Sequence, residues 1–445
     1  MPIQRDTPRE SVRRTLLYHL EKHVVKSNGL NTLLVLLLMS IKHLRMRRFI
    51  IMSMHRNNMA VMLELLLQQS QRFRRMLIAV QSHVRLCDKV LCLPYRRSTK
   101  RMELKGPDAF TEVEFLEQFR FRKPHFFRIL SCLKDFNGNF LMSNNEPIRL
   151  CIGVTGKAIR VRADKALMVL LRRLAYPCRW IDLQFILGGS RTELSDTYNY
   201  MLELMHVRYS RLTSSLACYR YQFARFTQQL ASFGCPFDNL VGMFDGHLVA
   251  TCRPGGDACV GLNMWDFQTF AGKERLHGLK YQACVLPNGL CVVWGPWRGT
   301  AADAAMFYET GALDALAQAQ EELGETYCGF GDSAYPIHRH MQRILKAPPE
   351  GSLTRLQRRY NALMARFRVL IEDVFGEAHN YFASLTHRHN MRLGSQRCGQ
   401  MFPVSMLFYN LRTLLYGNQA ASYYEGEKML LEVTVEEYLG LADLF

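Results

Sequence analysis

The sequence predicts an α/β protein in which a mixed-sheet domain follows an all-helical N-terminal region. Two observations lead to this fold class. Residues 238–382 contain several short β-like runs set between helical segments, whereas apolar residues upstream recur at helical spacing. The 445 residues suffice for two or three domains, and 48% apolar with 22% charged residues indicates a globular chain.

Residues 1–105 predict a basic helical extension. They are rich in Leu, Met and Arg, and hold 21 lysines and arginines against 6 acidic residues, a net charge of +15. The remaining residues hold 36 against 33, a net charge of +3. Two interpretations stay open: a solvated extension or leader, and an arm that contacts a polyanion such as nucleic acid.

The sequence disfavours membrane and disulfide-rich classes. The longest apolar run, Leu33–Met39, is too short to span a bilayer, so no membrane partner is expected. The 13 cysteines form no Cys-x-x-Cys pair, and many lie in apolar runs, such as Cys151, Cys284 and Cys291. This usage is typical of reduced, buried thiols in an intracellular protein and argues against a zinc site.

Residues 106–215 predict a helical domain that begins at the Gly106-Pro107 break. Its first part holds closely spaced aromatic residues with interleaved Arg and Lys. Such a cluster is either a packed core or a stacking surface for nucleic acid, and the core interpretation is favoured. The aromatic residues are Phe115, Phe119, Phe121, Phe126 and Phe127.

Residues 164–206 have the pattern of a helix-turn-helix. Two helical runs, 166–174 and 180–187, precede a Gly188-Gly189 turn, and Ser190 with Glu193 has the capping-box spacing that starts a third helix. Its polar face offers side chains able to reach base edges, namely Arg191, Thr192, Ser195 and Asn199. The alternative is an ordinary three-helix packing unit.

Residues 216–422 predict the sheet domain, followed by an acidic tail at 423–445. Strands are expected at 239–245, with a continuation at 248–252, and at 279–286, 290–294 and 326–330. Helices are expected at 301–322 and 353–375, and Pro287-Asn288-Gly289 indicates a hairpin turn. Three antiparallel strands, a helix, a further strand and then helices describe a mixed sheet of ribonuclease-H-like type. The tail is either solvated or covers the basic extension.

Three carboxylates are the candidate catalytic and metal-binding residues. Asp245 and Asp332 each close a short β-like run, and Glu372 lies at the border of the apolar stripe of the helix expected at 353–375. Converging carboxylates hold hard divalent cations, and two such ions promote phosphodiester cleavage. In the alternative interpretation, Asp245 and Asp332 support turns and Glu372 is a surface residue.

These residues lie in motifs that resemble the PIF/Harbinger group of DDE-type transposases and the domesticated nucleases derived from them. The motifs are Asp245-Gly-His, Gly331-Asp332-Ser-Ala-Tyr335-Pro336 and Ile371-Glu372-x-x-Phe375-Gly376. Further similarities are Gly278-Leu-Lys-Tyr-Gln, Gly299-x-x-x-Asp303 and Leu-Ala-Tyr-Pro at 174–177. The resemblance covers about residues 110–415. The family usually has Thr where this chain has His247.

The resemblance implies a ribonuclease-H-like DDE nuclease that hydrolyses phosphodiester bonds, and transfers strands in transposition, with Mg²⁺ or Mn²⁺. Asp245, Asp332 and Glu372 match the family's metal-binding triad, and Asp303 matches a further acidic position, taken as an alternate ligand. DNA is the implied partner, with Arg358 and Arg359 as further candidate DNA contacts. The resemblance also implies a Myb-like partner protein and location in the nucleus. A homo-oligomer, and the cytoplasm as an additional site, are further expectations. The competing interpretation is a transposase-derived DNA- or protein-binding module that no longer cuts.

Overall fold

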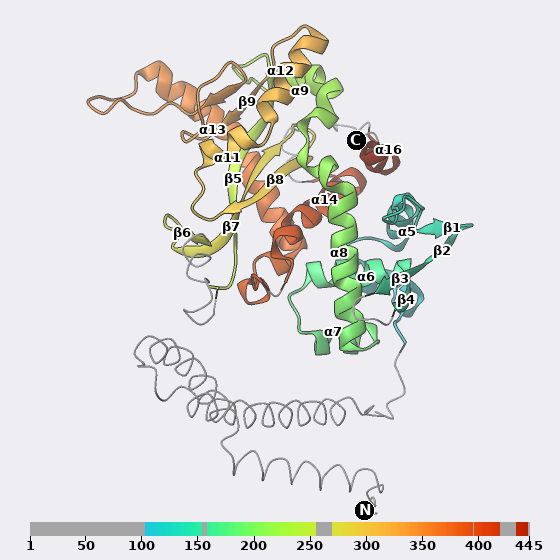
Figure 1. The fold of residues 1–445 in the computed structure, drawn as a ribbon. Coiled ribbons are helices and arrows are strands. Elements are labelled where there is room, and N and C mark those ends of the chain that lie inside the picture. Colours follow the sequence, from blue (N-terminus) through green and yellow to red (C-terminus); the bar gives the residue numbers. More distant parts are fainter. Residues whose placement is uncertain (1–102, 154–157, 255–268, 395, 419–432, 444–445) are drawn as a thin grey trace, which may run out of the picture. The chain divides into compact units, whose positions relative to one another are not determined.

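The computed structural model describes residues 103–153, 158–254, 269–394, 396–418 and 433–443. They belong to one compact unit, Lys100–Phe445 (Figure 1). Nearly all of the expected basic extension, including the Leu33–Met39 run, lies outside the described residues. In the part that is described, no helix combines the length and the apolar character needed to cross a membrane. The domain boundaries expected at 105, 215 and 422 stay predictions.

A mixed six-stranded sheet forms the centre of the described fold. The central strand β5 (Leu240–Ala250) pairs antiparallel with β7 (Leu276–Val285) and parallel with β9 (Cys328–Gly331). Beyond them, β8 (Cys291–Arg298) and the short β6 (Phe270–Ala271) pair antiparallel with β7, and β10 (Met341–Arg343) pairs parallel with β9. The expected α/β class with a mixed sheet is therefore confirmed.

The strands form where the sequence expects them because their buried ends are continuous apolar runs. Residues 240–244 of β5, 281–285 of β7 and 291–294 of β8 are all buried. The expected hairpin joins β7 to β8: the Leu286 N–H donates to the Leu290 carbonyl at 2.9 Å. Gly289 adopts φ +79° in this turn, a left-handed conformation that glycine tolerates.

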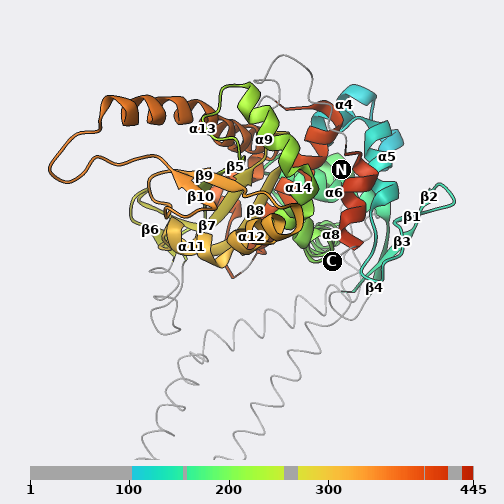
Figure 2. The same cartoon turned by 90° about the horizontal axis from the view of Figure 1, so that it is seen from above.

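Helices cover the sheet (Figures 1 and 2). Strand β5 contacts α9 (Phe223–Ser232) and α13 (Arg355–Tyr381), β7 contacts α11 (Asp303–Glu309), and β8 contacts α14 (Cys398–Tyr416). The prediction of a single helix at 301–322 is wrong. It is divided into α11 and α12 (Ala312–Leu323) at Gly311, where φ is +68°. Helix α13 begins at a capping box between Thr354 and Gln357 and continues past the expected end at 375.

The upstream region contains the expected helices but also strands. Helices α6 (Ala163–Ala175), α7 (Trp180–Leu187) and α8 (Arg191–Ser214) match the three expected helices, and Ser190 and Glu193 form the expected capping box. They follow α4 (Glu112–Phe119) and α5 (Lys123–Cys132). Short 3-10 helices lie at Pro107–Ala109, Leu216–Gln222, Ala383–Leu385 and Arg388–Asn390.

The prediction of an all-helical region is wrong between α5 and α6. Two hairpins lie there, β1 (Met142–Ser143) with β2 (Glu146–Pro147), and β3 (Arg149–Gly153) with β4 (Ala158–Arg162). Burial in β3 alternates, with Leu150 and Ile152 inside, which is the period of a half-buried strand. The same strand leaves Cys151 exposed, so this thiol does not fit the expectation of buried cysteines, whereas Cys284 and Cys291 do.

The aromatic cluster of residues 115–127 is core, as expected. The side chains of Phe115, Phe119, Phe121 and Phe126 have no solvent exposure. The Phe115 ring contacts the rings of Phe119 and Phe126, with centroids 4.6 and 5.2 Å apart. These rings are therefore not a stacking surface for nucleic acid.

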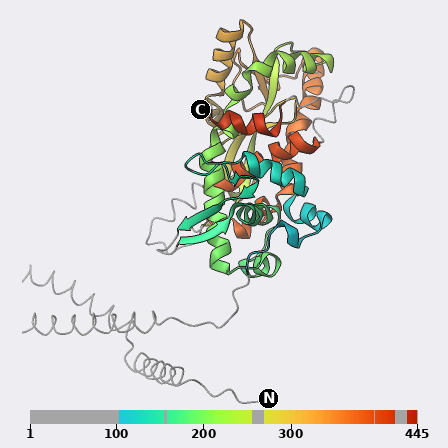
Figure 3. The same cartoon turned by 90° about the vertical axis from the view of Figure 1, so that its right-hand side faces the viewer.

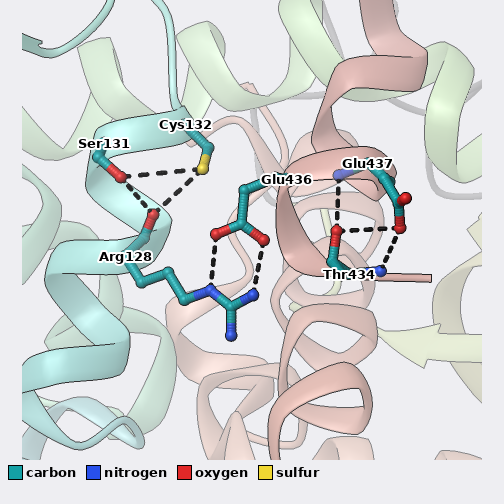
Figure 4. A network of polar contacts seen from close by, with 6 residues as sticks. All are labelled: Arg128, Ser131, Cys132, Thr434, Glu436 and Glu437. Carbon is teal, nitrogen blue, oxygen red and sulfur yellow. Dashed lines mark hydrogen bonds and ion pairs between the residues drawn. The ribbon is translucent and has the colours of Figure 1, made fainter. Parts of the chain in front are cut away.

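The described part of the acidic tail folds against the helical region. Helix α16 (Val435–Gly440) contacts α5, and the 3-10 helix Leu441–Asp443 contacts α8 (Figure 3). Figure 4 shows the Arg128 guanidinium on the Glu436 carboxylate, with nitrogen–oxygen distances of 2.6 and 2.7 Å. Asp443 accepts hydrogen bonds from Lys134 and Arg208 at 2.6 and 2.7 Å. These acidic residues bind basic residues of the helical region.

Candidate active site

Asp245 lies within β5 and not at its end, because the strand continues to Ala250. The carboxylate has two partners: Oδ1 accepts from the Gly246 N–H at 2.9 Å, and Oδ2 accepts from Arg368 Nη2 of α13 at 3.1 Å. The Asp245 main-chain carbonyl accepts from Gln282 Nε2 of β7 at 3.1 Å. Both the side chain and the backbone of Asp245 are thus held from neighbouring elements.

Asp332 follows β9 directly and lies close to Asp245 in space. In the parallel pairing of β5 with β9, Met243 stands opposite Phe330, so Asp245 and Asp332 each lie two residues further along adjacent strands. Asp332 Oδ1 accepts from the Ala334 N–H at 2.8 Å, the turn that the alternative interpretation described. This bond orients Asp332 but leaves its second oxygen available to a cation.

The electrostatic surroundings of Asp245 reflect this closeness. Burial raises the pKa of Asp245 above its ordinary value, and the Asp332 charge adds to that increase. The Arg368 guanidinium and the Gly246 N–H act in the opposite direction. A cation held between Asp245 and Asp332 would relieve the repulsion between the two carboxylates.

Tyr335 and Gln282 form a buried support beneath the two aspartates. Neither residue is exposed, and Gln282 Nε2 donates to the Tyr335 hydroxyl as well as to the Asp245 carbonyl. The pKa of Tyr335 is raised, first by burial and then by Asp245, Asp303 and Asp332. The sequence motifs contain both residues, but no rule of spacing assigned Gln282 a role.

Asp303, the alternate candidate, lies beside the same strand. It is the first residue of α11, and its Oδ1 is 3.6 Å from Lys280 Nζ of β7. A Cβ added to Gly246 would lie 2.5 Å from Asp303 Oδ1. The close approach of Asp303 to β5 therefore depends on glycine at the position after Asp245.

Glu372 lies on α13 with its side chain exposed. Its neighbours Ile371, Val374 and Phe375 are buried. Arg368, one helical turn earlier, is the α13 residue that contacts Asp245. Across the described ranges, no three His, Cys, Asp or Glu residues are grouped as metal ligands. The structure thus places Asp245, Asp303 and Asp332 around Tyr335, and it carries Glu372 exposed on α13, one helical turn beyond the residue that contacts Asp245.

The candidate DNA contacts fall on two helices. In α8, Arg191 and Thr192 are exposed, whereas Ser195 and Asn199 are half-buried, and Asn199 Nδ2 donates to the Ser195 carbonyl at 2.9 Å. Helix α8 packs on α6, α7, α14 and β8, so most of its surface is already used for packing. In α13, Arg358 and Arg359 are exposed, and Arg358 Nη1 donates to the Leu353 carbonyl at 2.9 Å.

The donor chemistry of the site fits a hard divalent cation. Asp245, Asp332 and Asp303 offer only carboxylate oxygens, the ligands that Mg²⁺ and Mn²⁺ prefer. A guanidinium on Asp245 shows that this position accepts positive charge. The residues present therefore fit a divalent cation in chemistry, with Asp245 and Asp332 as its nearest pair of ligands.

A mixed sheet with neighbouring carboxylates on two central strands is typical of metal-dependent phosphodiester-cleaving enzymes. Residues 245–410 match the family model described as "DDE superfamily endonuclease". The matched segment begins at Asp245 and contains Asp303, Asp332 and Glu372. No curated protein and no solved structure matches the chain. The family match identifies residues 245–410 as similar to an endonuclease domain, without identifying the PIF/Harbinger subgroup.

Proposed function

We propose that the protein is a metal-dependent DNA endonuclease or transposase, or a domesticated derivative, of PIF/Harbinger type. The observation that supports this most strongly is the placement of Asp245 and Asp332 on adjacent strands within the segment similar to DDE endonucleases. Two carboxylates brought together from distant parts of the chain are what a metal-dependent nuclease needs.

The strand order supports a ribonuclease-H-like sheet. Strands β5, β7 and β8 form an antiparallel series along the chain, and β9 then pairs parallel with β5 after two helices. This is the arrangement that the sequence analysis expects, with β10 added beyond β9. It places Asp245 on the central strand and Asp332 directly after the neighbouring strand β9.

In the proposed site, Asp245 and Asp332 would hold Mg²⁺ or Mn²⁺, with Glu372 as the third ligand and Asp303 as the alternate. A bound cation would supply Lewis-acid activation of water and neutralisation of the leaving oxygen. Gln282 fixes the Asp245 backbone, and the Ala334 N–H fixes one oxygen of Asp332. These residues orient the carboxylates before substrate binds.

DNA is the proposed substrate and partner. The exposed arginines Arg358 and Arg359 lie on the helix that also carries Arg368 and Glu372, which makes them candidate phosphate contacts. Arg191 and Thr192 at the start of α8 are the exposed candidates of the helix-turn-helix. A Myb-like partner and a nuclear location accompany this proposal as implications of the family resemblance, and a homo-oligomer as a further expectation.

A second candidate function is a binding module without cleavage activity. The Arg368–Asp245 ion pair favours it, because this arginine already neutralises the carboxylate of the central strand.

The test is nicking of supercoiled plasmid in Mn²⁺ by the wild type, Asp245→Asn and Glu372→Gln. We expect nicking by the wild type and roughly a hundredfold loss or more in both variants, since mutating even the partners that orient metal ligands costs about 10–100-fold. Asp373→Asn is the matched control on α13 and should retain activity. Equal nicking by Asp245→Asn and the wild type would contradict the assignment. DNA binding without nicking by any form would favour the binding module.

A further inference from the structure

The Arg368–Asp245 contact is the ion pair that joins α13 to the candidate site. Arg368 Nη2 lies 3.1 Å from Asp245 Oδ2, and the two side chains are only 19% and 23% exposed. The Arg368 Nε atom is buried and has no hydrogen-bond partner. Arg368 thus loses hydration for a single contact, which indicates that Asp245 is what keeps it inside.

Arg368 places its charge where a cation bound by Asp245 would have to lie. Asp245 Oδ1 is already engaged by the Gly246 N–H, so Oδ2 is the oxygen that Arg368 and a metal ion would share. A guanidinium and a divalent cation repel each other at this distance in a partly buried site. The charge of Arg368 at this oxygen therefore weakens the binding of a second cation by Asp245.

We propose that Arg368 is a built-in competitor of the divalent cation at Asp245, so that metal binding requires release of α13 from this carboxylate. The inference rests on the proposed function of the site and adds a regulatory device to it. Glu372, the candidate third ligand, lies one turn beyond Arg368 on the same helix. Release of Arg368 from Asp245 therefore removes a contact of the part of α13 that carries Glu372. The metal-free state is then held by Arg368, and the metal-bound state frees its guanidinium for a phosphate.

The pairing also offsets the repulsion between Asp245 and Asp332. Two adjacent carboxylates repel each other, and Arg368 is the cation that contacts one of them. Lys280 is paired with Asp303 at 3.6 Å and donates to the Ala301 carbonyl. Arg343 donates to the Tyr335 carbonyl at 2.7 Å, so Arg368 is the cation paired with Asp245.

The experiment measures Mn²⁺ affinity by titration calorimetry, with bound manganese checked by electron paramagnetic resonance. The forms compared are the full-length wild type, Arg368→Gln, Arg368→Lys and Arg355→Gln. Arg355 lies on the same helix, is exposed and undergoes the same change of charge, so it controls for general electrostatics. We expect Arg368→Gln to bind Mn²⁺ roughly tenfold more tightly than the wild type, as removal of a partly buried charge competitor implies.

Arg368→Lys keeps the charge and should stay within about threefold of the wild type, because a cation remains near Asp245. If Arg368→Gln does not fold, Arg368→Met, which keeps the length of the side chain without its charge, replaces it, and metal-free and manganese-bound melting temperatures replace the calorimetry. A larger manganese-induced stabilisation of Arg368→Met than of the wild type supports competition, and an equal or smaller one overturns it.

The outcomes separate this inference from the proposed function. Wild type and Arg368→Gln binding Mn²⁺ equally, or Arg368→Gln binding it more weakly, overturns the competition and leaves the metal site standing. An equal gain in Arg355→Gln also overturns it, because the effect is then general electrostatics. Failure of every form to bind Mn²⁺ overturns both the competition and the proposed metal site.

Discussion

At the scale of single residues, His247 connects the strand of Asp245 to the helix of Glu372. Its ring stacks on Phe375 and Phe402, with centroids 4.3 and 4.9 Å apart. Its Nε2 is 3.1 Å from His379 Nε2, so one ring must donate while the other accepts. Burial first, and His379 second, lower the pKa of His247 from 6.5 to about 3.

We predict that this pair makes the fold sensitive to acid. A folded pKa below the unfolded value means that the unfolded chain binds more protons, so stability is complete above pH 6.5 and falls toward pH 3. The loss approaches about 1.4 kcal/mol per pH unit for one group. Urea unfolding in chelator at pH 7.5, 6.5 and 5.5 gives the unfolding free energy as a function of pH. This free energy should fall less steeply toward acid in His247→Phe, which keeps the ring packing, than in the wild type.

The exposed His389 supplies the control. His389→Gln should keep the wild-type dependence of unfolding free energy on pH, because an exposed side chain away from special features contributes little to stability. If the unfolding free energy of His247→Phe depends on pH as steeply as that of the wild type, the acid sensitivity arises elsewhere.

At the scale of elements, a single side chain joins the edge of the sheet to two helices. Asn410 of α14 is fully buried, and its Oδ1 accepts from the Cys291 N–H of β8 at 2.9 Å. Its Nδ2 donates to the Cys291 carbonyl at 2.8 Å and to the Tyr438 hydroxyl of α16 at 2.9 Å. At Cys291, the Asn410 amide thus makes the two backbone hydrogen bonds that a further strand beside β8 would make.

Asn410→Ala is expected to destabilise the protein by about 3 kcal/mol or more, because it leaves several buried polar groups without partners. Tyr438→Phe removes only one of these bonds and should cost about 1 kcal/mol. Urea unfolding monitored by circular dichroism compares the three forms. A loss in Asn410→Ala no larger than that in Tyr438→Phe would contradict the role of Asn410 at the strand edge.

The strands and helices of the core could be predicted because apolar period and turn residues act locally. The runs ending at Phe244 and Phe330 and the stripe around Ile371 gave their elements directly. The pairing of Arg368 with Asp245 and of Asn410 with Cys291 depends on tertiary packing, which no local pattern records. Glu372 illustrates the same limit: its helix was predictable, whereas its exposure depends on how α13 is placed on β5.

At the scale of the whole described unit, an ion pair connects the late helix α16 to the early helix α5. Arg128 of α5 pairs with Glu436 of α16 at 2.6 Å, and both side chains are nearly half exposed. Beside them, Val435, Tyr438 and Leu439 are buried. The ion pair therefore adds orientation to a contact that apolar burial stabilises.

A double-mutant cycle of Arg128→Gln and Glu436→Gln should give a coupling of about 0.2–1 kcal/mol at low salt, the range for exposed pairs. In 1 M salt the coupling should fall toward zero, since the screening length is then about 3 Å. Glu437→Gln is the control. Glu437 caps α16 by accepting from the Thr434 N–H at 2.8 Å (Figure 4). Salt affects this local bond less, so the stability loss of Glu437→Gln should change less in 1 M salt. A coupling that survives 1 M salt would refute this account.

The contact between α5 and α16 also has a consequence for synthesis on the ribosome. Arg128 and Glu436 are separated by 308 positions, so α5 emerges long before its partner exists. At ordinary elongation rates this delay is on the order of tens of seconds. Throughout that interval the nascent helix lacks the partner that later packs against it. The contact between α5 and α16 therefore forms late in synthesis, whatever the upstream helices have already formed.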